Sequence, residues 1–227
     1  MNTFVKWACG SAAAVVLATA AAGAMWWQSI DLASQPLANR DIKPGQLNLL
    51  QRPVTERRGK ILAIVTSTPH AGGGKINAGL ELTELSRAYY VFKANGYDVE
   101  IASPQGGLPP VNIDEDLIEA DFAFINDPEA QRLLGSTARL ADVDASQFQA
   151  VYVVGGKGVM FDLAEAGPAQ RIIAAVYDRG GVIGAVCHGP VALLATRLAD
   201  GRPLLEGRKV TGFANEEEEI KNSFQPY

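Results

Sequence analysis

The sequence predicts an α/β fold built on a doubly wound parallel sheet. Short runs rich in β-branched residues recur along the chain, and each ends in small or turn-forming residues, as strands buried on both faces do. Amphipathic helical segments separate these runs, and a repeated strand, helix, strand order favours right-handed crossovers. The expected strands span residues 60–67, 98–103, 150–154 and 181–186.

Two helices are expected between these strands. Apolar side chains recur at helical spacing within residues 80–95, and Gly96 follows as a helix stop. Residues 169–179 show the same pattern between Pro168 and Gly180. In sheets of this type ligands bind beyond the carboxyl ends of the strands, so the residues that follow each strand are the candidates for a functional site.

Composition limits the class of protein. The chain has 227 residues, of which 48% are hydrophobic and 20% charged, and this allows one full core. A formal net charge of -5 and the lack of a readable basic patch argue against a nucleic-acid partner. Because Cys9 lies in an apolar leader, Cys187 has no disulfide partner in the folded part and is expected to be a free thiol.

The N-terminal segment is apolar. No charged residue occurs from Trp7 to Trp27, and a helix of that length just spans a bilayer. We therefore expect residues 1–27 to anchor the chain in a membrane, with the folded domain on the periplasmic or another extracytoplasmic side. Residues 22–24, with the sequence Ala-Gly-Ala, also fit a signal-peptidase site, so secretion into the periplasm or medium after cleavage is the alternative.

A tether and one domain are expected after this segment. Residues 28–58 contain Pro36, Pro44, Gly45 and Pro53, a composition typical of a linker. The α/β domain is expected to occupy the rest of the chain, residues 59–227.

The strongest candidate for a functional site is a cysteine at a strand-to-helix turn. In the sequence AVCHGP, residues 185–190, a predicted buried strand meets a helix that Pro190 can begin. Small residues permit the strained turn of a nucleophile elbow, and the helix N-terminus supplies amide donors that stabilise a thiolate. We therefore predict that Cys187 is a nucleophile; the alternative is a small buried hydrophobic residue.

A glycine-rich loop, GGKG at residues 155–158, follows the third predicted strand. Bare backbone there can approach a ligand, so the amides of Gly156 and His188 are candidate oxyanion donors, with an ordinary turn as the alternative. His188 itself could act as a base if a carboxylate orients its ring; otherwise it contributes only its amide. No metal site is expected, because two separated histidines and one thiol give no ligand spacing.

Acidic residues provide a third element. Glu81 and Glu84 fall early in the first predicted helix, where a half-buried acid could share a proton with a thiolate, and helical spacing does not choose between them. Residues 216–219 are consecutive glutamates, for which a charged helix start is the alternative to a functional role. The acidic stretch at residues 114–129 is expected to be a solvated surface segment.

Taken together, the motifs AVCHGP, VGGKGVMFDL, ELTELSRAYYVFKANGYDVEIASPQGG and GRPLLEGRKVTGF resemble the ThiJ/PfpI (DJ-1/PfpI) superfamily, the class I glutamine-amidotransferase-like group. Within it the resemblance is to the branch of heat-shock chaperones and glutathione-independent glyoxalases, over about residues 59–219. It implies a flavodoxin-like sheet with Cys187 as nucleophile and His188 as its basic neighbour. It also implies that Glu218 orients the histidine and that Glu84 contacts the thiol, with no metal or cofactor.

Two features depart from the family pattern. Lys157 stands where the family often has histidine, and family members usually continue for several tens of residues past Tyr227, with a final strand and helix. We therefore expect the C-terminal part of the family domain to be missing, unless another element covers the exposed sheet edge.

The resemblance implies an enzyme of glyoxalase type, which converts methylglyoxal or a related 2-oxoaldehyde to a 2-hydroxy acid (D-lactate from methylglyoxal) without glutathione. A stress-response chaperone or a thiol redox sensor without turnover is the alternative, with Cys187 cycling through sulfenic acid in the sensor. An amidotransferase-like hydrolase is a weaker third, because the orienting acid lies within an acidic run. The expected ligand is a small aldehyde, and homodimer formation is considered.

Overall fold

The computed structural model of the protein describes residues 16, 18–25, 37–165 and 167–224. The chain divides into two units, residues 1–37 and 38–227, and each is described by itself.

A five-stranded parallel sheet forms the centre of the second unit, in the order β7-β5-β1-β8-β9. The predicted α/β architecture is therefore confirmed, and each of the four expected strands is present. The fifth strand is a two-residue edge strand that sequence periodicity does not reveal. The strands are β1 (Gly59–Ile64), β5 (Tyr97–Ser103), β7 (Ala138–Arg139), β8 (Phe148–Val153) and β9 (Val182–Ala185).

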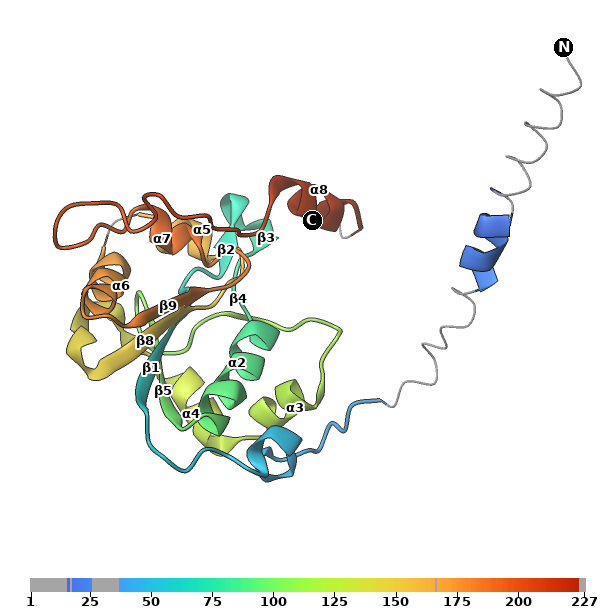
Figure 1. Ribbon diagram of the computed structural model, residues 1–227, viewed down its shortest axis with the longest axis horizontal. Coiled ribbons are helices and arrows are strands. Elements are labelled where there is room, and N and C mark those ends of the chain that lie inside the picture. The colour runs from blue at the N-terminus through green and yellow to red at the C-terminus, as the bar shows by residue number, and fades with distance from the viewer. Residues whose placement is uncertain (1–15, 17, 26–36, 166, 225–227) are drawn as a thin grey trace, which may run out of the picture. The chain divides into compact units, whose positions relative to one another are not determined.

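Helices cover both faces of the sheet (Figure 1). One face carries α2 (Leu82–Ala94), α3 (Glu119–Ile125) and α4 (Pro128–Gly135), and the other carries α5 (Val159–Asp162), α6 (Pro168–Asp178) and α7 (Val191–Leu194). The two resulting apolar layers hold β1 and β8 between them. Because both faces of these strands are buried, they lack the alternating pattern of a one-sided sheet.

Shorter elements complete the described chain. Helix α8 (Asn215–Phe224) carries acidic residues in its first turn, where the helix dipole favours them. The remaining elements are β2 (His70–Ala71), β3 (Ile76–Asn77), β4 (Leu80–Glu81), β6 (Val111–Asn112), η2 (Pro44–Gln46), η3 (Asn48–Leu50), η4 (Gly72–Gly74), η5 (Leu140–Asp142) and η6 (Ala145–Gln147).

The predicted tether is partly folded onto the domain. Ile42 and Leu47 are each only 4% exposed and belong to the core beneath α2 and α3. The Asn126 side-chain amide donates hydrogen bonds to the backbone carbonyls of Arg40 (2.8 Å) and Ile42 (3.1 Å). The folded unit therefore begins near Ala38 and not at Gly59.

The structure of the first unit does not support the predicted membrane anchor. Trp7 and Trp27 lie outside the described residues, and residues 18–25 are helical. Within the described ranges, no helix has both the length and the apolar character needed to cross a bilayer. The localisation inferred from the apolar run, a membrane-anchored chain with an extracytoplasmic domain, is therefore wrong, and its secreted alternative is not retained.

The acidic stretch at residues 114–129 is not wholly solvated, contrary to expectation. Asp121 is fully buried and accepts hydrogen bonds from Arg87 at 2.9 Å, from Ser86, and from the backbone amide of Ile118 at 2.9 Å. A buried carboxylate is tolerated when it is paired in this way. Asp121 therefore links α3 to α2, and this pairing could not be read from a run of like charges.

We expect Asp121→Ala to lower the free energy of unfolding by about 3 kcal/mol, because it removes the buried acceptor of several hydrogen bonds. Asp116→Ala is the matched control. Asp116 approaches the same Arg87 at 3.7 Å but has a 74% exposed side chain, so its loss should cost less than about 1 kcal/mol. Urea unfolding of both variants measures the difference, and equal losses would contradict the assigned role of Asp121.

Candidate active site

Cys187 occupies a strained turn between β9 and α7. Its φ of 55° makes it the one non-glycine residue with positive φ among the described residues. This conformation costs about 1–3 kcal/mol and persists only where the surroundings impose it. The Gly189 amide closes the turn with a 2.7 Å hydrogen bond to the Val186 carbonyl. A β carbon on Gly189 would lie 2.6 Å from the Val153 carbonyl oxygen, so glycine is required there.

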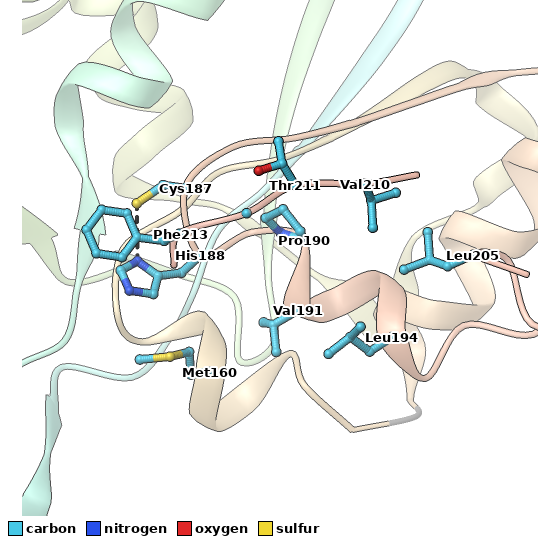
Figure 2. Close-up of a pocket in the computed structure, with 11 residues that line it drawn as sticks. Met160, Cys187, His188, Pro190, Val191, Leu194, Leu205, Val210, Thr211 and Phe213 are labelled. Atoms are coloured by element: carbon cyan, nitrogen blue, oxygen red, sulfur yellow. Dashed lines mark hydrogen bonds between the residues drawn. The ribbon is translucent and has the colours of Figure 1, made fainter. Parts of the chain in front are cut away.

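The side chains of Cys187, His188 and Glu218 form a continuous chain of contacts. The Cys187 Sγ lies 3.2 Å from His188 Nδ1, and His188 Nε2 lies 3.3 Å from Glu218 Oε2. Figure 2 shows the sulfur directed at the imidazole, with the ring of Phe213 beside them. The Phe213 and His188 rings stack with centroids 4.6 Å apart, and the Phe213 amide donates to the Cys187 carbonyl at 2.9 Å. Phe213 therefore holds the histidine ring in place.

Lys157 binds the second oxygen of the same carboxylate. Its Nζ lies 2.6 Å from Glu218 Oε1, and the lysine residue is only 7% exposed. Burial alone would raise the pKa of Glu218, but the hydrogen bonds and charges of Lys157 and His188 outweigh it and lower that pKa. Glu218 thus stays ionised while it joins α8 to the glycine loop and to His188.

Glu84 approaches Cys187 from α2, which covers the sheet face opposite to the one covered by α7. Its Oε2 accepts a 2.7 Å hydrogen bond from the Gly155 amide. A β carbon on Gly155 would lie 2.5 Å from Glu84 Oε2 and 2.7 Å from Cys187 Cβ. Glu81 is directed elsewhere, with its Oε1 accepting from the Asn112 side chain at 3.3 Å. The tertiary structure thus separates two glutamates that helical spacing leaves equivalent.

Comparison with known proteins identifies the family of the chain. A profile of the DJ-1/PfpI family matches residues 75–227. The chain belongs to the DJ-1/PfpI family. It is 32% identical over 172 residues to Glyoxalase 3 of Candida albicans, and this alignment covers 71% of each protein. It is 30% identical over 171 residues to the glutathione-independent glyoxalase HSP31 of Saccharomyces cerevisiae, again with 71% of each covered.

Two solved structures are similar to this fold. The crystal structure of glyoxalase III from Candida albicans matches with a TM-score of 0.63 and 29% identity, over 71% of each chain. The Rapid Encystment Protein of Francisella tularensis matches with a TM-score of 0.67 and 28% identity, over 74% of this chain and 77% of that one.

The Cys187 thiol holds its proton strongly in the resting site. Burial, together with the negative charge and hydrogen bond of Glu84, raises the pKa of Cys187 to about 12. Hydrogen bonds from the backbone amides of Gly156 and His188 lower the pKa and only partly oppose this rise. Attack by this sulfur therefore requires a base in contact with it, and His188 Nδ1 is in that position.

The structure thus brings together Cys187, His188, Glu218, Glu84 and the Gly156 amide, all of the site residues expected for a member of this family. Sequence reasoning did not single out Phe213, although the motif ending in TGF contains it, or the pairing of Lys157 with Glu218. Within the described part of the chain, no cluster of three or more His, Cys, Asp or Glu side chains is arranged to hold a metal ion.

We expect Gly155→Ala to disrupt the site, because its methyl group would overlap Glu84 and Cys187. Overpacking of this kind costs about 1–3 kcal/mol, which corresponds to a loss of roughly 2–12 °C in Tm for a domain of this size. Gly184→Ala in β9 is the control, since its nearest contact would be an ordinary 3.5 Å to Tyr152. Thermal unfolding tests both variants; a Gly155→Ala protein as stable as Gly184→Ala would disprove the close packing.

Proposed function

We propose that the protein is a cysteine-dependent glyoxalase that converts 2-oxoaldehydes to 2-hydroxy acids without glutathione. The observation that supports this most directly is the contact chain from the Cys187 sulfur through His188 to Glu218, at 3.2 and 3.3 Å. It combines a nucleophile, a base and an orienting acid in the manner of a catalytic triad. The two curated relatives with glyoxalase names, each at least 30% identical, favour the same reaction.

The first step forms a bond between sulfur and the aldehyde carbon. As Cys187 attacks, His188 accepts the thiol proton at Nδ1, and Glu218 stabilises the resulting imidazolium through Nε2. The aldehyde oxygen becomes an alkoxide and receives hydrogen bonds from the amides of Gly156 and His188 before it is protonated. The product of this step is a hemithioacetal on Cys187.

The second step moves hydrogen between adjacent carbons. His188, again neutral, removes the proton from the carbon bonded to sulfur, which gives an enediolate, and returns it to the neighbouring carbon. The former aldehyde carbon is thereby oxidised to a thioester while the former ketone carbon is reduced to an alcohol. Water then cleaves the thioester, releasing the 2-hydroxy acid and the free thiol. The overall reaction consumes only water, so it needs no external oxidant.

The thiol sensor is a weaker interpretation of the same residue. Oxidation to sulfenic acid proceeds through the thiolate, and a pKa raised to about 12 keeps the resting thiolate population low. A nucleophile that reacts only when substrate is bound can keep a high resting pKa, provided that a base in contact with the sulfur removes the proton during attack. His188 is such a base.

The wild-type protein should consume methylglyoxal and form lactate with no added glutathione, and Cys187→Ala should abolish this activity. Glu218→Gln should lower kcat/KM by about tenfold to a hundredfold, because it weakens the orientation of His188 but leaves the nucleophile in place. Glu216→Gln, in the same turn of α8, should have no effect. Lactate formation measured for each variant tests these expectations. Undiminished turnover by Cys187→Ala would refute the mechanism.

Lys157→Met should move the acidic limb of the kcat/KM profile to higher pH. Lys157 lowers the pKa of Glu218, so without it Glu218 becomes protonated at a higher pH and ceases to support His188 there. Lys157→Arg keeps the cation and should leave the limb in place. The pH dependence of kcat/KM for the two variants is the measurement. A Lys157→Met enzyme with reduced activity but an unshifted limb would mean that the lysine is only structural.

A further inference from the structure

A cavity that begins at Cys187 extends beyond the catalytic side chains. It has a volume of about 310 Å³, at the lower end of small-molecule sites. Figure 2 shows Cys187, His188 and Phe213 at one end and Leu194, Leu205 and Val210 at the other. Pro190, Val191, Thr211, Gly212 and Met160 also line it. The sulfur therefore lies at one end of an elongated and mainly apolar space.

We propose that this cavity binds an unbranched apolar side chain of the substrate, so that the protein acts on 2-oxoaldehydes with alkyl chains longer than that of methylglyoxal. This inference rests on the proposed function for the reacting end of the molecule. The aldehyde carbon lies at Cys187, and the alkyl chain extends along Val191, Leu194 and Val210.

The size of the cavity supports a longer substrate. A water-sized group occupies about 30 Å³, so the five non-hydrogen atoms of methylglyoxal fill at most about half of the space. Water in the remaining half would face apolar walls that offer it few hydrogen bonds. An alkyl chain displaces this water and buries apolar surface, which is favourable in proportion to the area covered.

The chemistry of the lining selects an uncharged chain. No Asp, Glu, Lys or Arg is among the lining residues, and Thr211 provides a hydroxyl group. Lys157, the nearby cation of the site, is bound to Glu218 at 2.6 Å. A substrate side chain ending in phosphate or carboxylate would lose hydration without gaining an ionic partner, which is costly.

Two exposed side chains indicate where the alkyl chain lies. Leu194 is 66% exposed and Val210 57% exposed, although both are apolar and both line the cavity. Val191 and Leu194 are three positions apart in α7 and so lie on one face of the helix. A bound alkyl chain would cover this face and continue onto Val210.

The test is a series of straight-chain 2-oxoaldehydes, from methylglyoxal to 2-oxooctanal, with the full-length protein. We expect kcat/KM to rise about fourfold per added methylene until the cavity is full. Leu194→Asn and Val210→Asn should each reduce the ratio of kcat/KM for 2-oxooctanal to that for methylglyoxal by about tenfold. Leu108→Asn is the matched control, because Leu108 is 74% exposed and does not line the cavity.

A second readout does not depend on catalysis. N-alkylmaleimides of increasing chain length alkylate the Cys187 thiol, and mass spectrometry of the Cys187 peptide gives the rate free of any contribution from Cys9. Relative to free cysteine, the rate should rise with chain length in the wild-type protein and rise less in Leu194→Asn.

The outcomes separate the two proposals. Methylglyoxal turnover with no preference for longer chains, and a flat maleimide series, would overturn the side-chain site and leave the proposed function intact. If no aldehyde is consumed, the proposed function fails, and the maleimide series decides the rest. A rise with chain length then supports the apolar site beside Cys187, and a flat series refutes it.

Discussion

The left-handed backbone of Cys187 is the constraint on which the site depends. A side chain at φ 55° can be held only where β9 ends against β8 and where the following turn is closed by backbone contacts. The Gly189 amide closes the turn by its hydrogen bond to the Val186 carbonyl. Gly155 allows Glu84 and Cys187 to pack against the backbone, because it lacks the β carbon that would overlap both side chains. The turn places the sulfur beside the Glu84 carboxylate and 3.2 Å from Nδ1 of His188.

Charge balance around the sulfur follows from that placement. Glu84 on one side favours the protonated thiol, whereas the Gly156 and His188 amides favour the thiolate. His188 can take the proton because Glu218 and the ring of Phe213 fix its orientation. Lys157 in turn holds Glu218 on a helix whose other acidic residues are exposed. Few of these groups are adjacent in sequence, so the fold assembles them.

Much of this arrangement can be predicted from local sequence. Four strands and the helices at residues 82–94 and 168–178 follow from β-branched runs and from helical spacing, although the strand at residues 182–185 lies at the sheet edge and has no fully buried residue. The elbow at Cys187 is also local, since a strand, small residues and Pro190 are consecutive. The choice of Glu84 and Glu218 came from the family resemblance, because helical periodicity gives no information about which carboxylate faces a distant thiol.

The sequence by itself thus determined the fold class, the family and the position of Cys187 at the turn between a strand and a helix. Only the tertiary structure decided which charges are paired. Asp121 is buried within an acidic stretch and Lys157 selects one glutamate of a run, because each contact joins elements far apart in the chain. The apolar N-terminal run shows the same limit: composition suggested a bilayer span, but among the described residues no helix is long and apolar enough to cross a membrane. Hydropathy reports how apolar a segment is. Which charged side chains pair and which residues are buried depend on contacts with segments far away in the chain.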